Sequence, residues 1–289
     1  MKSLVFLMSM LCFALMAQHD RAFVIYNAKG KPVKFSALKS KALASQLVLF
    51  GEYHDNPITH WLQLELTKEA FAEKGTNLVL GFEMFEQDQQ HVLTRYLNGG
   101  IPEKSLKDSL RLWPNYETDY APLVEFAKTN KLACIADNIQ RKYASLMFKK
   151  GRNAFDTLSP SILNQMADPH FFIDTNLSQY KELREMASHM PAGMGGPSYM
   201  VESQAFKDAT MAKFILANMN PSSFFIHFNG AYHSDFYQGI MWYVKQQNPD
   251  LKITTISTVT QEDISKLLDE NLGRADYIIC VPQSMTRTH

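Results

Sequence analysis

The sequence is poor in cysteine, with three in 289 residues, and it has no excess of charge of either sign. Lysine and arginine together number 29, as do aspartate and glutamate, and no run of basic residues stands out. Without a stripe of positive charge that could follow a phosphate backbone, nucleic acid is not an expected partner. Internal repeats and low-complexity tracts are also missing. A hydrophobic fraction of 46% over this length instead predicts one large globular domain, or such a domain with an insertion.

Several catalytic motifs are absent as well. The sequence has no G-x-S-x-G nucleophile elbow, no P-loop, no G-x-G-x-x-G after an expected strand and no H-E-x-x-H zinc helix. The corresponding enzyme classes therefore find no support in the sequence.

The N-terminal segment MKSLVFLMSMLCFALMAQHD has the layout of a secretory signal peptide. Its apolar run covers residues 4–17, which is short of the roughly 20 residues that span a bilayer. We predict a signal peptide at residues 1–17, cleavage after Ala17, and a periplasmic or exported mature chain without a transmembrane segment. A lipid anchor on Cys12 is less favoured, because Leu11 before it is bulky. Cys134 and Cys280 lie in apolar runs, which favours buried free thiols over a disulfide.

Six apolar runs have the length and the β-branched or aromatic content of strands. They lack clean alternation of apolar and polar residues, which indicates strands covered on both faces. The runs are residues 46–50, 77–82, 132–135, 223–228, 252–258 and 277–281.

Helical patterns alternate with these strands. The clearest begins at Asn56, an expected N-cap followed by Pro57, ends at Gly75, and has an apolar face with Trp61 and Phe71. Others cover residues 86–97, 119–129, 206–217 and 234–246. We therefore predict an α/β fold with a mostly parallel open sheet flanked by helices. Residues 21–137 and 201–289 are expected to form this core, and residues 138–200, which contain no convincing strand, a helical insertion.

Polar side chains follow several of the expected strands. Glu52 and His54 come after the first, Glu83 ends the second, and the fourth leads into His233. Parallel strands end at one edge of a sheet, where ligands of α/β proteins bind, so these side chains are expected to converge. Two glutamates and two histidines suit zinc, manganese, cobalt or iron better than magnesium or calcium. Such a divalent transition metal would activate water for a peptidase-like or esterase-like hydrolysis.

Structural roles compete with these interpretations. Asp137 and Asn138 after the third strand, like Asp55 and Asn56 after the first, are residue types that cap the helix that follows. Arg141 comes one helical turn later and either reaches the same crevice to bind an anionic ligand or lies on the surface.

A second candidate site lies in the expected insertion, at residues 189–200. His189, Met194 and Tyr199 belong to the three residue types that ligate haem iron, and a methionine-rich surface suits a flat apolar ring. Taken alone, these residues favour the alternative, in which the methionines fill gaps in the core.

Five segments resemble one family. LVLFGEYHDNPITHWLQLEL, GFEMFEQDQQ, ADNIQRKY, SQAFKDATMA and HFNGAYHSD are similar, in this order, to segments of the ChaN family of haem-binding uptake proteins, over residues 45–242. ChaN belongs to the wider Tiki, TraB and erythromycin-esterase-like superfamily.

The resemblance implies an exported protein of haem and iron acquisition, with cofacial haems between the two subunits of a homodimer and a tyrosine ligand. Tyr180 and Tyr199 are the tyrosines to test. In the superfamily, paired Gly-x-x-His motifs, a glutamate and an arginine form the active-site signature, and some members are metal-dependent peptidases or esterases. This signature matches residues 51–54 and 230–233, Glu83 and Arg141. Many relatives are lipoproteins, which the sequence around Cys12 does not favour here.

Overall fold

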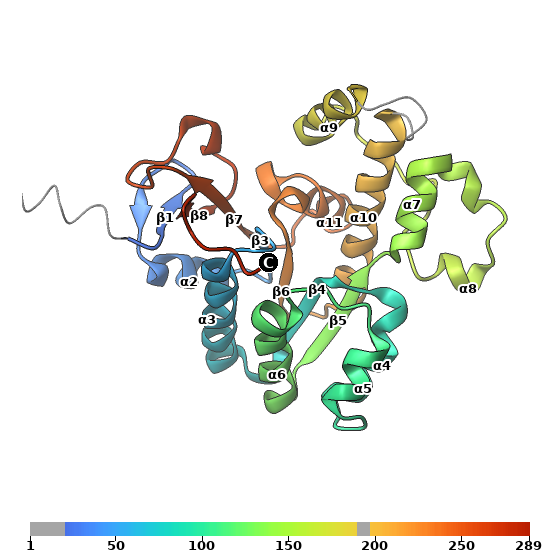
Figure 1. The fold of residues 1–289 in the computed structure, drawn as a ribbon, viewed down its shortest axis with the longest axis horizontal. Coiled ribbons are helices and arrows are strands. Elements are labelled where there is room, and N and C mark those ends of the chain that lie inside the picture. The colour runs from blue at the N-terminus through green and yellow to red at the C-terminus, as the bar shows by residue number, and fades with distance from the viewer. Residues whose placement is uncertain (1–20, 190–196) are drawn as a thin grey trace, which may run out of the picture.

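An eight-stranded sheet with the order β2-β1-β8-β7-β3-β6-β4-β5 forms the centre of the molecule (Figure 1). The computed structural model describes residues 21–189 and 197–289, with residues 197 and 198 described by their backbone only. The strands are β1 Val24–Asn27, β2 Pro32–Val33, β3 Leu47–Glu52, β4 Leu78–Glu86, β5 Ala133–Asn138, β6 Phe224–Gly230, β7 Ile253–Gln261 and β8 Tyr277–Pro282.

The pairing is parallel from β8 through β5, and only β1 and β2 add antiparallel contacts at one edge. The predicted fold class, a mostly parallel open sheet flanked by helices, is confirmed. All six predicted strands are present. Strands β1 and β2, which have only four and two residues, were not predicted.

Helices cover both faces of the sheet. Figure 1 shows α3 and α6 on one side and α10 and α11 on the other. The helices are α2 Phe35–Leu43, α3 Pro57–Lys74, α4 Gln90–Leu97, α5 Glu103–Ser109, α6 Ala121–Asn130, α7 Arg141–Lys150, α8 Pro160–Leu163, α9 Ser178–Ser188, α10 Pro197–Ala217 and α11 Ile240–Gln247.

The two helical layers explain why the strands are apolar throughout. Along β3, Val48 and Phe50 belong to the core cluster under α3 and α6, whereas Leu47 and Leu49 belong to the cluster under α10 and α11. All four are fully buried, because neighbouring side chains of a strand point to opposite faces and both faces are covered.

Helix α3 begins and ends as predicted, but its buried face differs from the prediction. The Asn56 side chain accepts a hydrogen bond from the Thr59 N–H at 3.0 Å, and Gly75 follows the last turn with φ of 56°. Trp61, expected in the apolar face, is 49% exposed. The buried face carries His60 and Gln63 beside leucines, because this side of the helix lies against a polar site.

The predicted insertion contains helices α7, α8 and α9. Its predicted end at residue 200 falls inside α10, which runs on as one helix to Ala217. The division of the chain into core and insertion stays a prediction.

The signal peptide, its cleavage after Ala17 and Cys12 lie outside the described residues. Among residues 21–189 and 197–289, no helix combines the length and the apolar character needed to span a membrane. Cys134 on β5 and Cys280 on β8 are both buried free thiols.

Candidate functional site

The two Gly-x-x-His segments lie side by side at one edge of the sheet. Strands β3 and β6 are parallel neighbours, and their register pairs Glu52 with Gly230. Each segment makes room for the other. A Cβ on Gly51 would lie 2.9 Å from the Ala231 Cα, and a Cβ on Gly230 would lie 2.9 Å from the His54 ring. Both contacts are closer than packed atoms tolerate, so a glycine is required at the start of each motif.

Glu52 orients His54. The His54 Nδ1–H donates to Glu52 Oε1 at 2.9 Å, while the opposite carboxylate oxygen accepts from the Gln63 amide at 2.5 Å. The Tyr120 hydroxyl also donates to Glu52, at 2.7 Å. Glu52 itself is 1% exposed. These partners hold the carboxylate rigidly and direct the other ring nitrogen, Nε2, away from Glu52.

A longer buried chain holds the second histidine. His233 Nε2 lies 3.1 Å from Glu83 Oε1, and its Nδ1–H donates to Asp208 Oδ1 at 2.5 Å. Glu83 also accepts the Gly230 N–H at 2.6 Å, and Asp208 accepts the Tyr180 hydroxyl at 2.8 Å. Both nitrogens of His233 therefore face carboxylates.

The two histidines differ in protonation and exposure. Burial opposes a charge on His233, but the Glu83 and Asp208 carboxylates outweigh it and raise the pKa of His233 to about 10. Burial likewise favours a neutral Glu83, yet His233 and His54 hold the pKa of Glu83 below its usual value. Burial lowers the pKa of His54, but the hydrogen bond to Glu52 and the charge of Glu83 outweigh burial and raise this pKa above its usual value. The His54 side chain is 39% exposed, against 7% for His233, so His54 is the imidazole that solutes reach.

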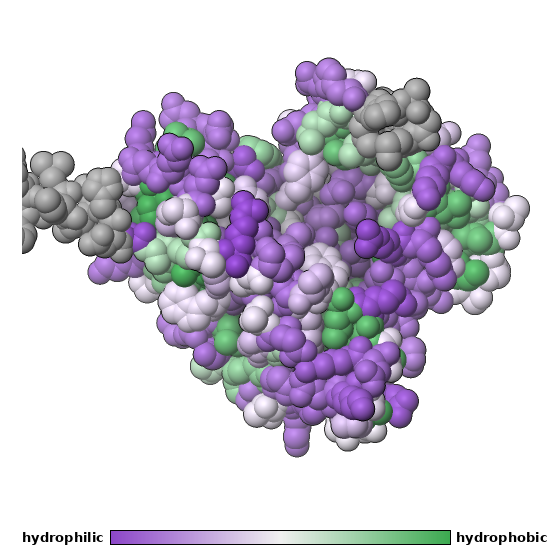
Figure 2. Space-filling model, viewed as in Figure 1, coloured by the Kyte–Doolittle hydropathy of each residue, from purple (hydrophilic) through white to green (hydrophobic). Residues whose placement is uncertain are grey.

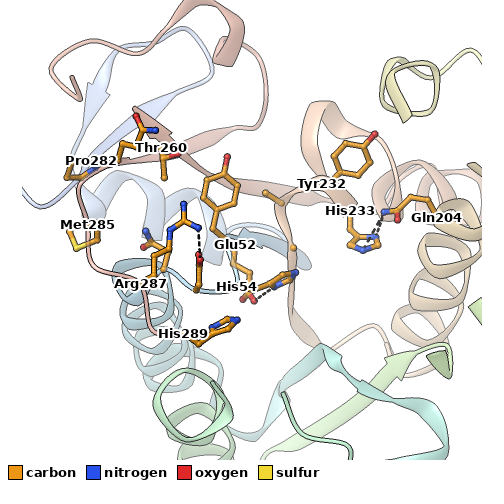
Figure 3. Close-up of a pocket in the computed structure, with 16 residues that line it drawn as sticks. Glu52, His54, Gln204, Tyr232, His233, Thr260, Pro282, Met285, Arg287 and His289 are labelled. Atoms are coloured by element: carbon orange, nitrogen blue, oxygen red, sulfur yellow. Dashed lines mark hydrogen bonds and ion pairs between the residues drawn. The ribbon is translucent and has the colours of Figure 1, made fainter. Parts of the chain in front are cut away.

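Two hollows meet at these histidines. One, of about 670 Å³, extends towards Tyr53, Thr260 and the C-terminal segment, which runs across its rim (Figure 3). There the Thr288 N–H donates to the Asp55 carbonyl at 3.0 Å. The other hollow, of about 540 Å³, extends between α7 and α10. Figure 2 shows this face hollowed in its middle and bordered mostly by hydrophilic residues.

The structure brings together five of the residues singled out in the sequence. Glu52, His54, Glu83 and His233 meet around Gly230, and Arg141, the first residue of α7, lines the 540 Å³ hollow with three of them.

The expected transition-metal site stays a prediction. Among residues 21–189 and 197–289, no three His, Cys, Asp or Glu side chains are arranged to hold one ion. The four expected ligands form two imidazole–carboxylate couples, Glu52 with His54 and Glu83 with His233.

The expected haem ligands are spread over the helical region. Tyr180 on α9 is 1% exposed, and its hydroxyl donates to Asp208. His189 is exposed at the end of α9, and Tyr199 is half-buried near the start of α10, where its ring lies over Gly151. Met194 lies outside the described residues.

Sequence reasoning missed several site residues. Asp208 was the detectable one, because it stands in a helical stretch whose other inward positions, Ala205 and Ala212, are apolar and fully buried. A carboxylate in such a stripe needs a partner. Gln63 and Tyr120 gave no comparable signal. Asn138 does not cap α7, since its amide donates to the Glu83 carbonyl at 2.9 Å.

Fold and site together define an α/β protein with a polar cavity at the carboxyl ends of its parallel strands. A family model described as haem-binding uptake, Tiki superfamily, ChaN matches residues 38–244. The chain belongs to this haem-binding uptake family.

Solved structures share the fold. ChaN of Campylobacter jejuni, solved with cofacial haem, is 19% identical with a TM-score of 0.68, over 90% of this chain and 97% of its own. A Bacillus cereus protein is 12% identical, with a TM-score of 0.53 over 88% and 95% of the two chains. The erythromycin esterase EreC, a mutant in its open conformation, is 11% identical, with a TM-score of 0.53 over 91% and 98%. No curated protein matches the chain in sequence.

We predict that Asp208→Asn lowers the pKa of His233 by roughly 1–3, because one of its two facing carboxylates loses its charge. NMR titration of the imidazole ring measures this. Asp156→Asn, which alters the carboxylate beside the exposed His170, is the matched control and leaves His233 unchanged.

The raised pKa of His233 in the wild type also affects the stability of the fold. Because the folded-state pKa of His233 is raised to about 10, its contribution to the free energy of unfolding is complete below about pH 6.5. The contribution is lost as the pH rises towards 10. An unfolding free energy with the same slope in the wild type and in His233→Gln over that interval would contradict the assignment.

Proposed function

We propose that this chain is an exported haem-binding protein that serves the acquisition of haem or iron. The observation that carries the proposal is membership of the haem-binding uptake family over residues 38–244. The fold similarity to a ChaN solved with cofacial haem supports it, and suggests a homodimer that holds haem between its subunits.

The helical region offers groups that fit a haem. Tyr199 and His189 are within reach of solvent, whereas the Tyr180 hydroxyl is committed to Asp208 in the core. Val201 and Glu202 follow Tyr199 on α10 by two and three residues. Both border a hollow of about 370 Å³. Its lining combines apolar surface and positive charge, from Phe172, Ile173, Arg152 and Arg184. Phe172 is 73% exposed.

Such a lining matches the chemistry of haem, which has a flat apolar ring and two carboxylates. The phenylalanine would contact the ring and the arginines would bind the propionates. Tyr199 is the ligand that we propose for the iron, with His189 and Met194 as further donors. Bound haem would supply the iron-centred chemistry.

Export is part of the proposal. It rests on the apolar run at residues 4–17, which is preceded by a lysine and followed by polar residues. Export would remove residues 1–17, and the mature chain would then bind haem outside the cytoplasm.

A second candidate function is hydrolysis at the strand ends. The observation that favours it is the Glu52–His54 couple, in which Nδ1–H is held at 2.9 Å and the other ring nitrogen is left to accept a proton. This arrangement is the one that orients a histidine general base. His54 would take a proton from water while the water oxygen attacks the carbonyl carbon of an ester. It would return this proton to the leaving alcohol as the bond between the carbonyl carbon and the alcohol oxygen breaks.

Haem binding is tested with hemin and absorption spectra. We expect a Soret band with the wild type, a dissociation constant at least about tenfold higher for Tyr199→Phe, and an unchanged one for Tyr180→Phe. Tyr180→Phe is the matched control, because it removes the same hydroxyl from a buried position. Size-exclusion chromatography with light scattering checks whether hemin doubles the mass. If the wild type leaves the Soret band of free hemin unshifted, haem binding is wrong.

Export is tested by expressing the full chain and measuring the mass of the protein in the periplasmic fraction. We expect the mass to lack residues 1–17. Full-length protein confined to the cytoplasm would contradict the proposal.

Hydrolysis is tested with p-nitrophenyl acetate. We expect His54→Gln to lower the rate by about 10²-fold or more, because the general base is lost. The wild-type rate rises with pH as His54 loses its proton, and this rise lies above pH 6.5 because the pKa of His54 is raised. His91→Gln changes an exposed histidine on α4 and serves as the control. Equal rates for His54→Gln and the wild type would rule the mechanism out.

A further inference from the structure

We propose that the 540 Å³ hollow between α7 and α10 is a binding site for an organic anion, a carboxylate or a phosphate monoester that carries an apolar group. Arg141 and Lys207 hold the anionic group, and Trp113 contacts the apolar group. The site lies beside His54 and is separate from the residues proposed for haem. It does not depend on haem binding.

Two cations in this hollow have no partner. Arg141 at the start of α7 and Lys207 on α10 both line it, and among residues 21–189 and 197–289 neither side chain has an ion pair or a hydrogen bond. The surroundings explain why their charges stay available. The acidic groups of the same hollow are already compensated, Glu83 by His233 at 3.1 Å and Glu86 by Arg111 at 2.6 Å.

The backbone adds to the positive potential. Helix α7 has ten residues and begins at Arg141, and its first turn borders the hollow. Partial positive charge gathers at such an N-terminus and favours an anion. The unpartnered side chains and the helix start thus attract the same kind of ligand.

One buried acceptor also lacks a partner. The Asn138 amide donates to the Glu83 carbonyl at 2.9 Å, but its Oδ1 is buried without a hydrogen-bond donor among the described residues. Buried acceptors are normally satisfied, so this oxygen indicates a donor supplied by a ligand or its water. A hydroxyl, amino or amide group near the anionic end of the ligand fits it.

Part of the remaining wall is apolar. Met84, Trp113, Ile139 and Phe148 line the hollow, and the Trp113 ring packs edge-on against His54 with centroids 4.6 Å apart. A wall of this kind binds a hydrocarbon or aromatic group. A small inorganic anion would leave the wall exposed, which is why the ligand class is an organic anion.

The test compares benzoate, phenyl phosphate and the neutral analogue benzamide, by calorimetry and by tryptophan fluorescence on the full mature chain. We expect benzoate or phenyl phosphate to bind saturably and benzamide at least about tenfold more weakly. The stronger of the two anions identifies the anionic group. Trp113→Phe should remove the fluorescence change and keep the calorimetric signal, because Trp61 and Trp242 lie outside the hollow.

Charge variants locate the site. Arg141→Gln with Lys207→Gln should weaken binding of the anion at least about tenfold, whereas Lys142→Gln, the same charge change on the next residue of α7, leaves it unchanged. Both changed side chains reach solvent, and circular dichroism verifies the fold.

Three results would overturn the proposal. The first is that neither benzoate nor phenyl phosphate binds more tightly than benzamide, and the second is an equal effect of Lys142→Gln and the double variant. The third is loss of the hemin Soret band in the double variant, which would assign these cations to haem. An unaltered Soret band in that variant supports two separate sites.

Discussion

The parallel pairing of β3 with β6 is the constraint on which the site depends. Its register places Glu52 beside Gly230, two residues that are far apart in the chain. Each glycine of the two Gly-x-x-His segments leaves space that an atom of the other segment occupies. A shift of the register by one residue would turn the side chains to the opposite face and separate Glu52 from Gly230. The site is therefore a property of the sheet rather than of either segment.

Once the strands are paired, charge compensation decides what the buried polar groups can do. Glu52 pairs with His54, His233 with Glu83 and Asp208, and His227 with Asp137 at 3.0 Å. Removing one member of such a buried pair leaves an uncompensated charge, which costs several kcal/mol, about 3–5. The couples are therefore interdependent. Arg141 and Lys207, which line the neighbouring hollow of 540 Å³, have no such partner among the described residues.

The parallel strands could be predicted from the sequence because each is an apolar run that is buried on both faces. Leu47 and Val48 of β3, for example, belong to core clusters on opposite faces of the sheet. The proximity of His54 and His233 could also be predicted, because parallel strands end at a common edge of the sheet. Prediction from the sequence failed where the cause is tertiary. Trp61 is exposed although it is apolar, because α3 turns its polar residues towards Glu52. Gln63 and Tyr120 reach Glu52 only through tertiary packing, which no local sequence pattern indicates.

Helix α10 connects the two regions to which function is attributed. Tyr199 lies near its start and Asp208 nine residues later, which at 1.5 Å per residue is a rise of about 14 Å. Asp208 faces the sheet through His233 and faces α9 through Tyr180. Through these two hydrogen bonds, one helix joins the region around Tyr199 and α9 to the strand-end cavity around His233.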